Sequence, residues 1–119
     1  MFVKILKSKL HLARVTETKL HYAGSIAIDS ELMEAVGILP YEAVIIADLD
    51  NGNRLETYAV LAEAGSRQIV VMGAAAQLIK PKDTVIIFSF GYYTPEQAKE
   101  IKPKIVALDE NNNIVKKIS

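Results

Sequence analysis

The chain has 119 residues, half of them hydrophobic, with no cysteine and no tryptophan. Lysine and arginine balance aspartate and glutamate at 14 each, so we expect no basic patch and no nucleic-acid partner. The missing cysteines exclude a disulfide, a cysteine-containing zinc site and a thiol nucleophile, and the length predicts a single domain over residues 1–119.

The apolar runs of the sequence give no sign of a membrane segment or a signal peptide. Lysines interrupt the apolar residues of Met1–Lys7, unlike the continuous core of a signal peptide. No apolar run approaches the roughly 20 residues of a spanning helix. We therefore expect a cytoplasmic protein without a membrane partner, and the near-neutral charge favours self-association.

Short β-branched runs between turn residues predict strands through the first half of the chain. These strands are expected over residues 2–6, 10–16, 25–28, 43–47 and 54–62. One helix is expected before the fourth strand, capped by Asp29 or Ser30 and ended by Gly37. Asn51-Gly52 predicts a type I′ hairpin turn, which needs positive φ at both central positions.

The second half continues the same pattern of short strands. Strands are expected over residues 68–72, 84–90, 104–108 and 113–118, with a turn at Pro81-Lys82-Asp83. A capped surface helix is expected over 94–101, with Pro95 at its first position. Many short strands with two small helices predict a closed β-barrel, which removes exposed sheet edges.

The familiar catalytic templates do not fit this chain. The glycines are isolated, so no phosphate-binding loop is expected, and Ser25 lies in Ala23-Gly24-Ser25-Ile26-Ala27 rather than in a G-x-S-x-G elbow. His11 and His21 are ten positions apart, so no compact metal motif is expected.

Gly24-Ser25 offers one unusual chemistry, although Gly65-Ser66 repeats the dipeptide and turns commonly use it. The Ser25 hydroxyl can attack the Gly24 carbonyl where the backbone is strained, since glycine has no Cβ to block the approach. The product is an ester, and β-elimination leaves dehydroalanine at position 25. Hydrolysis then releases ammonia and leaves a pyruvoyl group, an electrophilic carbonyl that no unmodified side chain supplies.

Seven separated motifs occur in order along the chain. They are Ser8-Lys9-Leu10-His11, Val15-Thr16, Leu20-His21-Tyr22-Ala23-Gly24-Ser25-Ile26-Ala27-Ile28-Asp29, Asn51-Gly52-Asn53-Arg54, Thr57-Tyr58, Gly65-Ser66-Arg67 and Gly73-Ala74-Ala75-Ala76. Together they resemble the aspartate α-decarboxylase family, pyruvoyl-dependent enzymes that make β-alanine for pantothenate biosynthesis. The resemblance implies a mainly β fold, a small six-stranded double-ψ β-barrel with short helices, assembled as a homotetramer with active sites at subunit interfaces.

The resemblance also implies autocatalytic cleavage of a proenzyme between Gly24 and Ser25. The products would be a β chain of residues 1–24 and an α chain of residues 25–119. Ser25 would become the covalent pyruvoyl cofactor, with no metal and no diffusible cofactor. Thr57 would polarise the Gly24 carbonyl during cleavage.

Further residues are implied in substrate binding and catalysis. Lys9 and Arg54 would hold the two carboxylates of L-aspartate, since arginine suits a planar bidentate pair and lysine a point contact. The substrate amine would form a Schiff base with the pyruvoyl ketone, Thr57 would contact the substrate, and Tyr58 would return a proton to the carbanion. The site would be lined by His11, Tyr22 and the backbone of Gly73, Ala74 and Ala75.

Three positions depart from the pattern expected of the family, and two other functions stay open. Leu12 stands where a basic residue is common, Met72 where asparagine is common, and Ala47 where tryptophan sometimes occurs. Leu12 and Met72 favour a non-catalytic barrel that binds a partner or small ligand. A proenzyme that needs a maturation partner is the other alternative. Glutamate is less favoured as substrate because its longer side chain would displace its carboxylate from Lys9.

Overall fold

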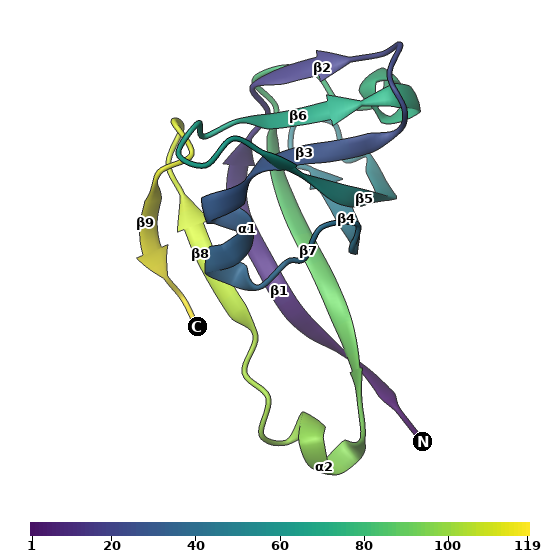
Figure 1. Ribbon diagram of the computed structural model, residues 1–119, viewed down its shortest axis with the longest axis vertical. Coiled ribbons are helices and arrows are strands. Elements are labelled where there is room, and N and C mark those ends of the chain that lie inside the picture. Colours follow the sequence, from purple (N-terminus) through teal and green to yellow (C-terminus); the bar gives the residue numbers. More distant parts are fainter.

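The computed structural model describes residues 1–119 and consists mostly of β-strands (Figure 1). The strands are β1 (Val3–Arg14), β2 (Glu17–Lys19), β3 (Ser25–Asp29), β4 (Ala43–Asp48), β5 (Arg54–Ala62), β6 (Ile69–Met72), β7 (Thr84–Tyr93), β8 (Lys104–Leu108) and β9 (Ile114–Lys117). The helical elements are α1 (Ser30–Val36), the 3₁₀ helix η1 (Gly73–Gln77) and α2 (Pro95–Ala98). The predicted mainly β fold with short helices is confirmed.

The nine strands form one sheet in the order β2-β6-β3-β5-β4-β7-β1-β8-β9. Its six central strands run from β6 to β1, and β2 and the β8–β9 pair extend the two sides. Thr16, just after β1, donates its backbone N–H to the carbonyl of Ile69 at the start of β6 at 2.9 Å. This contact brings the two ends of the six-strand series together, as closure into a barrel requires.

The sheet mixes parallel and antiparallel pairs, so strands distant in sequence become neighbours. β3 runs parallel to β5, and β1 runs parallel to β8. β3 also pairs antiparallel with β6. Strand β3 is therefore held on both sides by later parts of the chain, which fixes its first residue, Ser25, in register.

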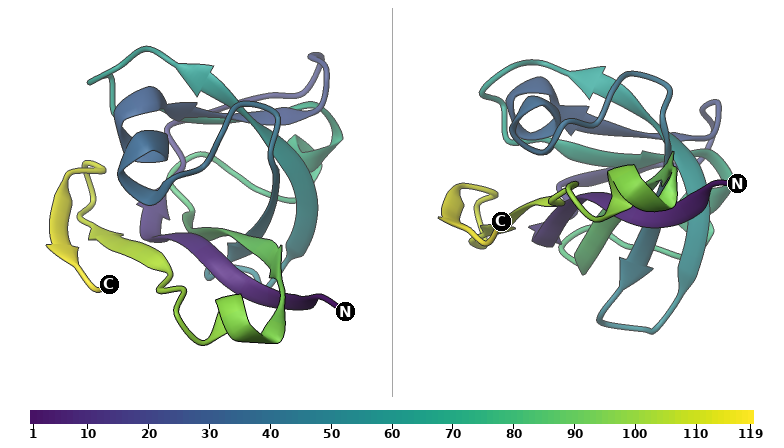
Figure 2. Two further views of the ribbon diagram at one scale, coloured as in Figure 1. Left: turned by 60° about the horizontal axis from the view of Figure 1, so that its bottom comes forward. Right: turned by 90° about the horizontal axis from the view of Figure 1, so that it is seen from below.

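The barrel interior is filled by a cluster of 19 buried apolar residues. Helix α1 adds Leu32, Met33 and Val36 to this core. Asp29 accepts a hydrogen bond from the backbone N–H of Glu31 at its start, and Gly37 ends it at φ 73°, as the sequence predicted. Figure 2 shows α1 lying against the strands on the side of the barrel where β8 runs.

Two element boundaries differ from the prediction near the N-terminus and in β7. Residues 2–6 and 10–16 were predicted as two strands, but β1 is one strand with register shifts between Leu6 and Ser8 and between Leu10 and Ala13. The second shift contains Leu12 at φ 62°, and a bulge of this kind breaks the alternation that a sequence pattern reads. Strand β7 continues past its predicted end to Tyr93 because it pairs with β1 up to Val3.

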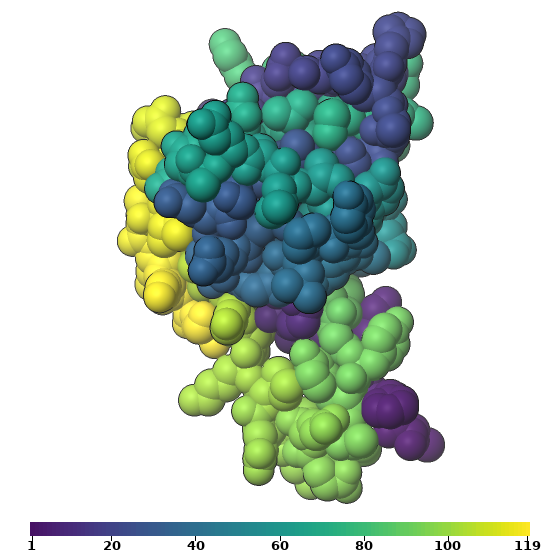
Figure 3. Space-filling view, viewed as in Figure 1, coloured from purple at the N-terminus to yellow at the C-terminus, as the bar shows by residue number.

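Helix α2 is shorter than predicted and ends at Ala98. The predicted cap is present: Thr94 accepts a hydrogen bond from the backbone N–H of Gln97, and the Gln97 side chain accepts one from the backbone N–H of Thr94. This segment and the N-terminal residues project from the lower end of the molecule in Figure 3. Neither α-helix has the length and apolar character that crossing a bilayer would require.

The predicted type I′ turn at Asn51-Gly52 is wrong. Gly52 has φ 77°, but Asn51 is not among the residues with positive φ. The connection runs over residues 49–53 because polar contacts hold a longer loop. Asp48 accepts the backbone N–H of Asp50 at 2.8 Å, and the side-chain amides of Asn51 and Asn53 both donate to the carbonyl of Leu78.

Candidate functional site

Ser25 is the first residue of β3 and is 4% exposed, whereas Gly24 before it is exposed. Ser25 pairs with Met72 of β6. The Gly24–Ser25 peptide bond therefore lies where the chain passes from an exposed turn into an ordered strand. Gly24 does not have positive φ. A left-handed backbone conformation therefore does not strain this bond.

Gly73 packs directly against the residue before the predicted cleavage bond. Its φ is +80°, and a Cβ built on it would lie 2.6 Å from Gly24 Cα and 3.0 Å from the carbonyl oxygen of Tyr22. No side chain fits at that separation. A Cβ on Gly24 would meet only the Met72 carbonyl oxygen, at 4.0 Å. At this bond, the steric demand for glycine is thus at position 73 rather than at position 24.

A pocket of about 280 Å³ opens beside this bond. It is lined by Gly24, Leu55, Glu56, Thr57, Met72, Ala74, Ala75 and Leu78. The parallel register of β3 and β5 pairs Ile26 with Ala59, and two residues earlier it sets Thr57 beside Gly24. The structure thus brings together four predicted site residues, Gly24, Thr57, Ala74 and Ala75, in what we name the cleavage pocket.

A second pocket, of about 330 Å³, contains the two predicted carboxylate-binding residues. It is lined by Leu6, Lys9, Ala47, Arg54, Ile86, Phe88 and Phe90. The Arg54 guanidinium carbon lies 5.0 Å from the centroid of the Phe88 ring, a contact that orients the guanidinium. We name this space the cationic pocket.

The predicted site residues of the two pockets lie on opposite faces of β5. Side chains alternate along a strand, so Arg54 and Tyr58 point to one face while Thr57 points to the other. The burial of β5 agrees, since Arg54 and Tyr58 are exposed and Thr57 is partly buried. The Tyr58 ring packs against that of Tyr41, with centroids 6.3 Å apart. One chain therefore presents Arg54 and Tyr58 away from its own Thr57.

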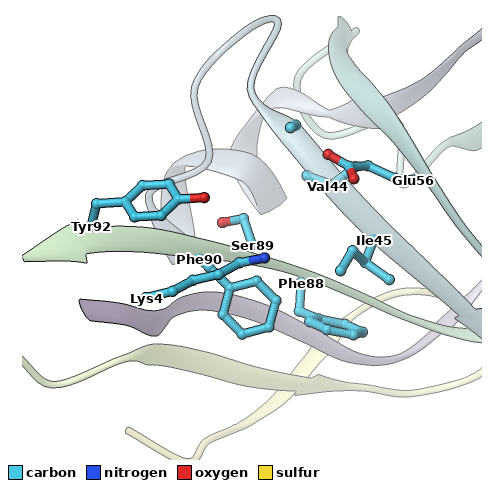
Figure 4. A pocket seen from close by; sticks show the side chains of 9 residues that line it. Lys4, Val44, Ile45, Glu56, Phe88, Ser89, Phe90 and Tyr92 are labelled. Atoms are coloured by element: carbon cyan, nitrogen blue, oxygen red, sulfur yellow. The ribbon is translucent and has the colours of Figure 1, made fainter. Parts of the chain in front are cut away.

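A smaller cavity of about 100 Å³ adjoins the cationic pocket and shares Phe88 and Phe90 with it. Figure 4 shows the Lys4 amine and the Tyr92 ring on one side of this cavity and Glu56 on the other. Glu56 was not predicted, although it lies between Arg54 and Tyr58 at the same alternation on β5, and it also lines the cleavage pocket. The alternation of side chains along β5 was the sequence feature that could have indicated Glu56 as a site residue.

Three predicted lining residues, His11, Tyr22 and Gly73, line neither pocket, and Ser25 and Tyr58 do not line them either. His11 pairs with Ala107 of β8, and its Nδ1 is buried without a hydrogen-bond partner. Tyr22 is 59% exposed, with the Lys19 amine 5.0 Å from its ring centroid. Neither the His11 nor the Tyr22 side chain therefore shares a pocket with the other predicted site residues.

The second Gly-Ser dipeptide is part of a structural turn. The Ser66 hydroxyl donates to the Glu63 carbonyl at 2.6 Å. Next to it, the buried Asp29 carboxylate accepts backbone N–H groups of Gly65 at 3.0 Å and Arg67 at 2.7 Å. Burial raises the pKa of Asp29, but these hydrogen bonds and the Arg67 guanidinium outweigh it and hold the pKa below its ordinary value. This network anchors the end of β3, four residues after Ser25.

Comparisons with known proteins find similarity to one family along nearly the whole chain. Residues 1–115 match the family model described as Aspartate decarboxylase. A protein of Caldicellulosiruptor saccharolyticus named Aspartate 1-decarboxylase is 51% identical over 98% of this chain and 91% of its own length. Proteins of the same name are 50% identical in Acetivibrio thermocellus, over 97% of this chain and 91% of the relative, and 47% identical in Salinibacter ruber, over 98% and 80%.

Among solved structures, the computationally designed msDPBB_sym2 protein matches 73% of this chain and 99% of its own, with a TM-score of 0.47 and 19% identity. The family model and the relatives cover nearly the whole chain. The chain belongs to the aspartate decarboxylase family.

Proposed function

We propose that this chain is a proenzyme that cleaves itself between Gly24 and Ser25 and then decarboxylates L-aspartate to β-alanine and carbon dioxide. The observation that carries the proposal is the cleavage pocket, which Gly24 lines together with Thr57, Ala74 and Ala75. The named activity of relatives about half identical over nearly the whole chain supports the substrate.

During cleavage, residues of the cleavage pocket hold the reacting groups. The Thr57 hydroxyl donates to the Gly24 carbonyl oxygen and stabilises the negative charge that develops as Ser25 attacks. Gly73 lets the backbone of η1 approach Gly24 closely. Since Ser25 is held in β3 by its register with Met72, it keeps its position after the bond to Gly24 breaks.

The cleavage pocket fits a pyruvoyl group formed from Ser25. About 280 Å³ of space lies beside Gly24, the residue before Ser25, which suffices for a small amino acid. The pyruvoyl group supplies a carbonyl conjugated with an amide, which withdraws electrons as carbon dioxide leaves. Lys9 and Arg54 bind the substrate carboxylates, and the Tyr58 hydroxyl donates the proton that completes β-alanine.

We further propose that two protomers of a homotetramer build each site. Arg54 and Tyr58 face away from Thr57 on β5, so the cationic pocket of one chain must meet the cleavage pocket of another for both to reach one substrate. Exposed apolar side chains, among them Tyr41 and Leu61 at 76% and 57% exposure, favour burial against another copy.

Complementation between two inactive variants tests this sharing. Ser25→Ala lacks the cofactor, and Arg54→Ala cleaves but binds aspartate poorly. Mixed tetramers made by co-expression contain sites with the intact Ser25 of one chain and the intact Arg54 of another. We expect the mixture to recover a measurable fraction of wild-type β-alanine formation. Activity no higher than that of the separate variants would show that each site lies within one chain.

Substrate choice is tested by comparing L-aspartate with L-glutamate in the cleaved enzyme, with Ser25→Ala as the control. We expect β-alanine and carbon dioxide from aspartate, and none in the control. Faster turnover of glutamate would contradict the assignment. Pantothenate biosynthesis and a cytoplasmic location follow as parts of the same proposal.

Met72 also leaves open a second candidate, a proenzyme that cleaves only with a maturation partner. Met72 lines the cleavage pocket where the family commonly has asparagine, so an amide donor is missing beside the bond. This candidate predicts an intact purified chain that cleaves after cell extract is added. A chain that stays intact with extract and turns over no aspartate would favour a non-catalytic binding barrel.

A further inference from the structure

Three carboxylates gather at the end of the barrel where the β4–β5 loop meets the turn before β7. Asp48 ends β4, Asp50 lies in the loop, and Asp83 precedes β7. One oxygen atom from each lies within 4.8 Å of the others. None of the three takes part in an ion pair, so the cluster has no positive side chain to balance its charge.

The buried member of this cluster lacks a partner. Asp48 is 3% exposed, and its Oδ2 atom is buried with no hydrogen-bond donor. A buried carboxylate oxygen without a partner is strongly unfavourable.

Backbone groups hold each carboxylate by one oxygen. Asp48 Oδ1 accepts the N–H of Asp50 at 2.8 Å, Asp50 Oδ2 accepts that of Thr84 at 2.7 Å, and Asp83 Oδ2 accepts that of Lys80 at 3.0 Å. The second oxygen of each carboxylate remains available to a ligand, and the three side chains are oriented before any ligand binds. Preorganisation of this kind reduces the entropy lost on binding.

We propose that Asp48, Asp50 and Asp83 bind one calcium ion, which joins the β4–β5 loop to the turn before β7. Calcium takes carboxylate oxygens at about 2.3–2.6 Å and completes its shell with water. Two such bonds span up to about 5 Å, so oxygens within 4.8 Å of one another can share one ion. Magnesium needs shorter bonds of about 2.0–2.1 Å and near-octahedral geometry, and fits this spacing less well.

The proposed ion would brace a segment that borders the cleavage pocket. In the same loop, the amides of Asn51 and Asn53 donate to the carbonyl of Leu78 at 2.8 and 2.9 Å, and Leu78 lines that pocket. The ion does not contact Ser25 or the substrate-binding residues. The site is independent of the proposed decarboxylation, and it can be tested on cleaved or intact protein.

Calcium binding is tested at pH 8 on the full chain after treatment with a chelator. The weakest class of protein calcium sites has dissociation constants near 10⁻⁴–10⁻³ M. For a site of that strength, 10 mM calcium chloride should raise the unfolding temperature by about 5–10 °C. Titration calorimetry should give one ion per chain. Magnesium chloride at the same concentration should give a smaller rise.

Two variants locate the site, and one controls for general charge effects. Asp48→Asn can donate its amide to Asp83, so the variant should fold, and it should lose the calcium effect. Asp83→Asn should also lose it. Asp109→Asn removes a carboxylate from another turn, where its Oδ1 caps the N–H groups of Asn111 and Asn113, and it should keep the effect.

Three results would overturn the proposal. The first is no calcium effect in the wild-type chain, and the second is an effect that persists in both Asp48→Asn and Asp83→Asn. The third is a wild-type chain stabilised by mild acid but not by calcium, because a proton shared by Asp48 and Asp83 would then satisfy the buried oxygen instead of an ion.

Discussion

Gly73→Ala should slow cleavage of the Gly24–Ser25 bond far more than it should disturb the rest of the fold. The added Cβ would lie 2.6 Å from Gly24 Cα and 2.9 Å from its nitrogen, so the backbone before the bond must move. A misplacement of about 1 Å at a reacting group lowers rates by roughly 10²-fold. We therefore expect cleavage to be at least about a hundredfold slower.

The structure provides a matched control in Gly52→Ala. Gly52 has φ +77°, close to the +80° of Gly73, but a Cβ there would meet nothing within 4 Å. Both variants carry the left-handed backbone penalty of about 1–2 kcal/mol, while only Gly73→Ala adds about 1–3 kcal/mol of overpacking. At about 4 °C per kcal/mol, Gly52→Ala should unfold about 4–8 °C lower and Gly73→Ala about 8–20 °C lower.

The assay is a time course of cleavage in freshly purified proenzyme, measured by denaturing electrophoresis and intact mass at a temperature where circular dichroism shows both variants folded. Gly52→Ala should cleave at the wild-type rate. Equal cleavage rates for the two variants would refute the argument that Gly73 positions Gly24.

Further predictions concern catalysis, acid stability and the fold. Tyr58→Phe should cleave normally but form β-alanine about 10²–10⁴-fold more slowly, and normal turnover would remove Tyr58 from proton donation. Asp29→Asn presents an amide to the Arg67 N–H groups and should lower the free energy of unfolding by about 2–5 kcal/mol in denaturant titrations near pH 7. The pKa of Asp29 lies below its ordinary value of 3.8. The ionised Asp29 carboxylate therefore stabilises the fold fully above pH 3.8, and this stabilisation is lost as the pH falls through the lowered pKa. Asp29→Asn should lose less stability on acidification than the wild-type chain, and an equal loss would contradict the lowered pKa of Asp29. Asn112→Ala leaves three backbone groups unpaired, the N–H and C=O of Arg14 and the C=O of Arg67; it should cost about 2–4 kcal/mol of unfolding free energy and leave cleavage unchanged, and an unchanged stability would show that water replaces its amide.

The parts of the fold that sequence predicted well are governed by local signals. Asp29 and Gly37 cap α1 where expected, because a side-chain acceptor and a left-handed residue act within a few positions. Strand β5 has its predicted bounds, Arg54–Ala62, because alternation and flanking turn residues agree there. Local chemistry sufficed in both cases.

Prediction failed where distant contacts decide the local shape. The loop after β4 is not a type I′ turn because the amides of Asn51 and Asn53 reach the Leu78 carbonyl, far along the chain. Strand β2 was missed since it has only three residues, Glu17–Lys19, and forms by pairing with β6. No periodicity can be read from so short a segment.

The sequence named candidate site residues, and the structure shows which of them lie together. Family resemblance selected Lys9, Arg54 and Thr57, and the structure groups the first two in one pocket and the third in another. The alternation of β5 already implied that Arg54 and Thr57 point to opposite faces. No sequence pattern predicted that Asp48 and Asp83 lie close together, because only the folded barrel brings these two positions near each other.

Intact mass under denaturing conditions tests the central claim most directly. We predict two chains, residues 1–24 and 25–119, with the larger one lighter by one ammonia than a fragment beginning with serine. Ser25→Ala should give one chain of full mass. A wild-type chain that stays unbroken, alone and with cell extract, would contradict the claim that Ser25 is a cofactor precursor.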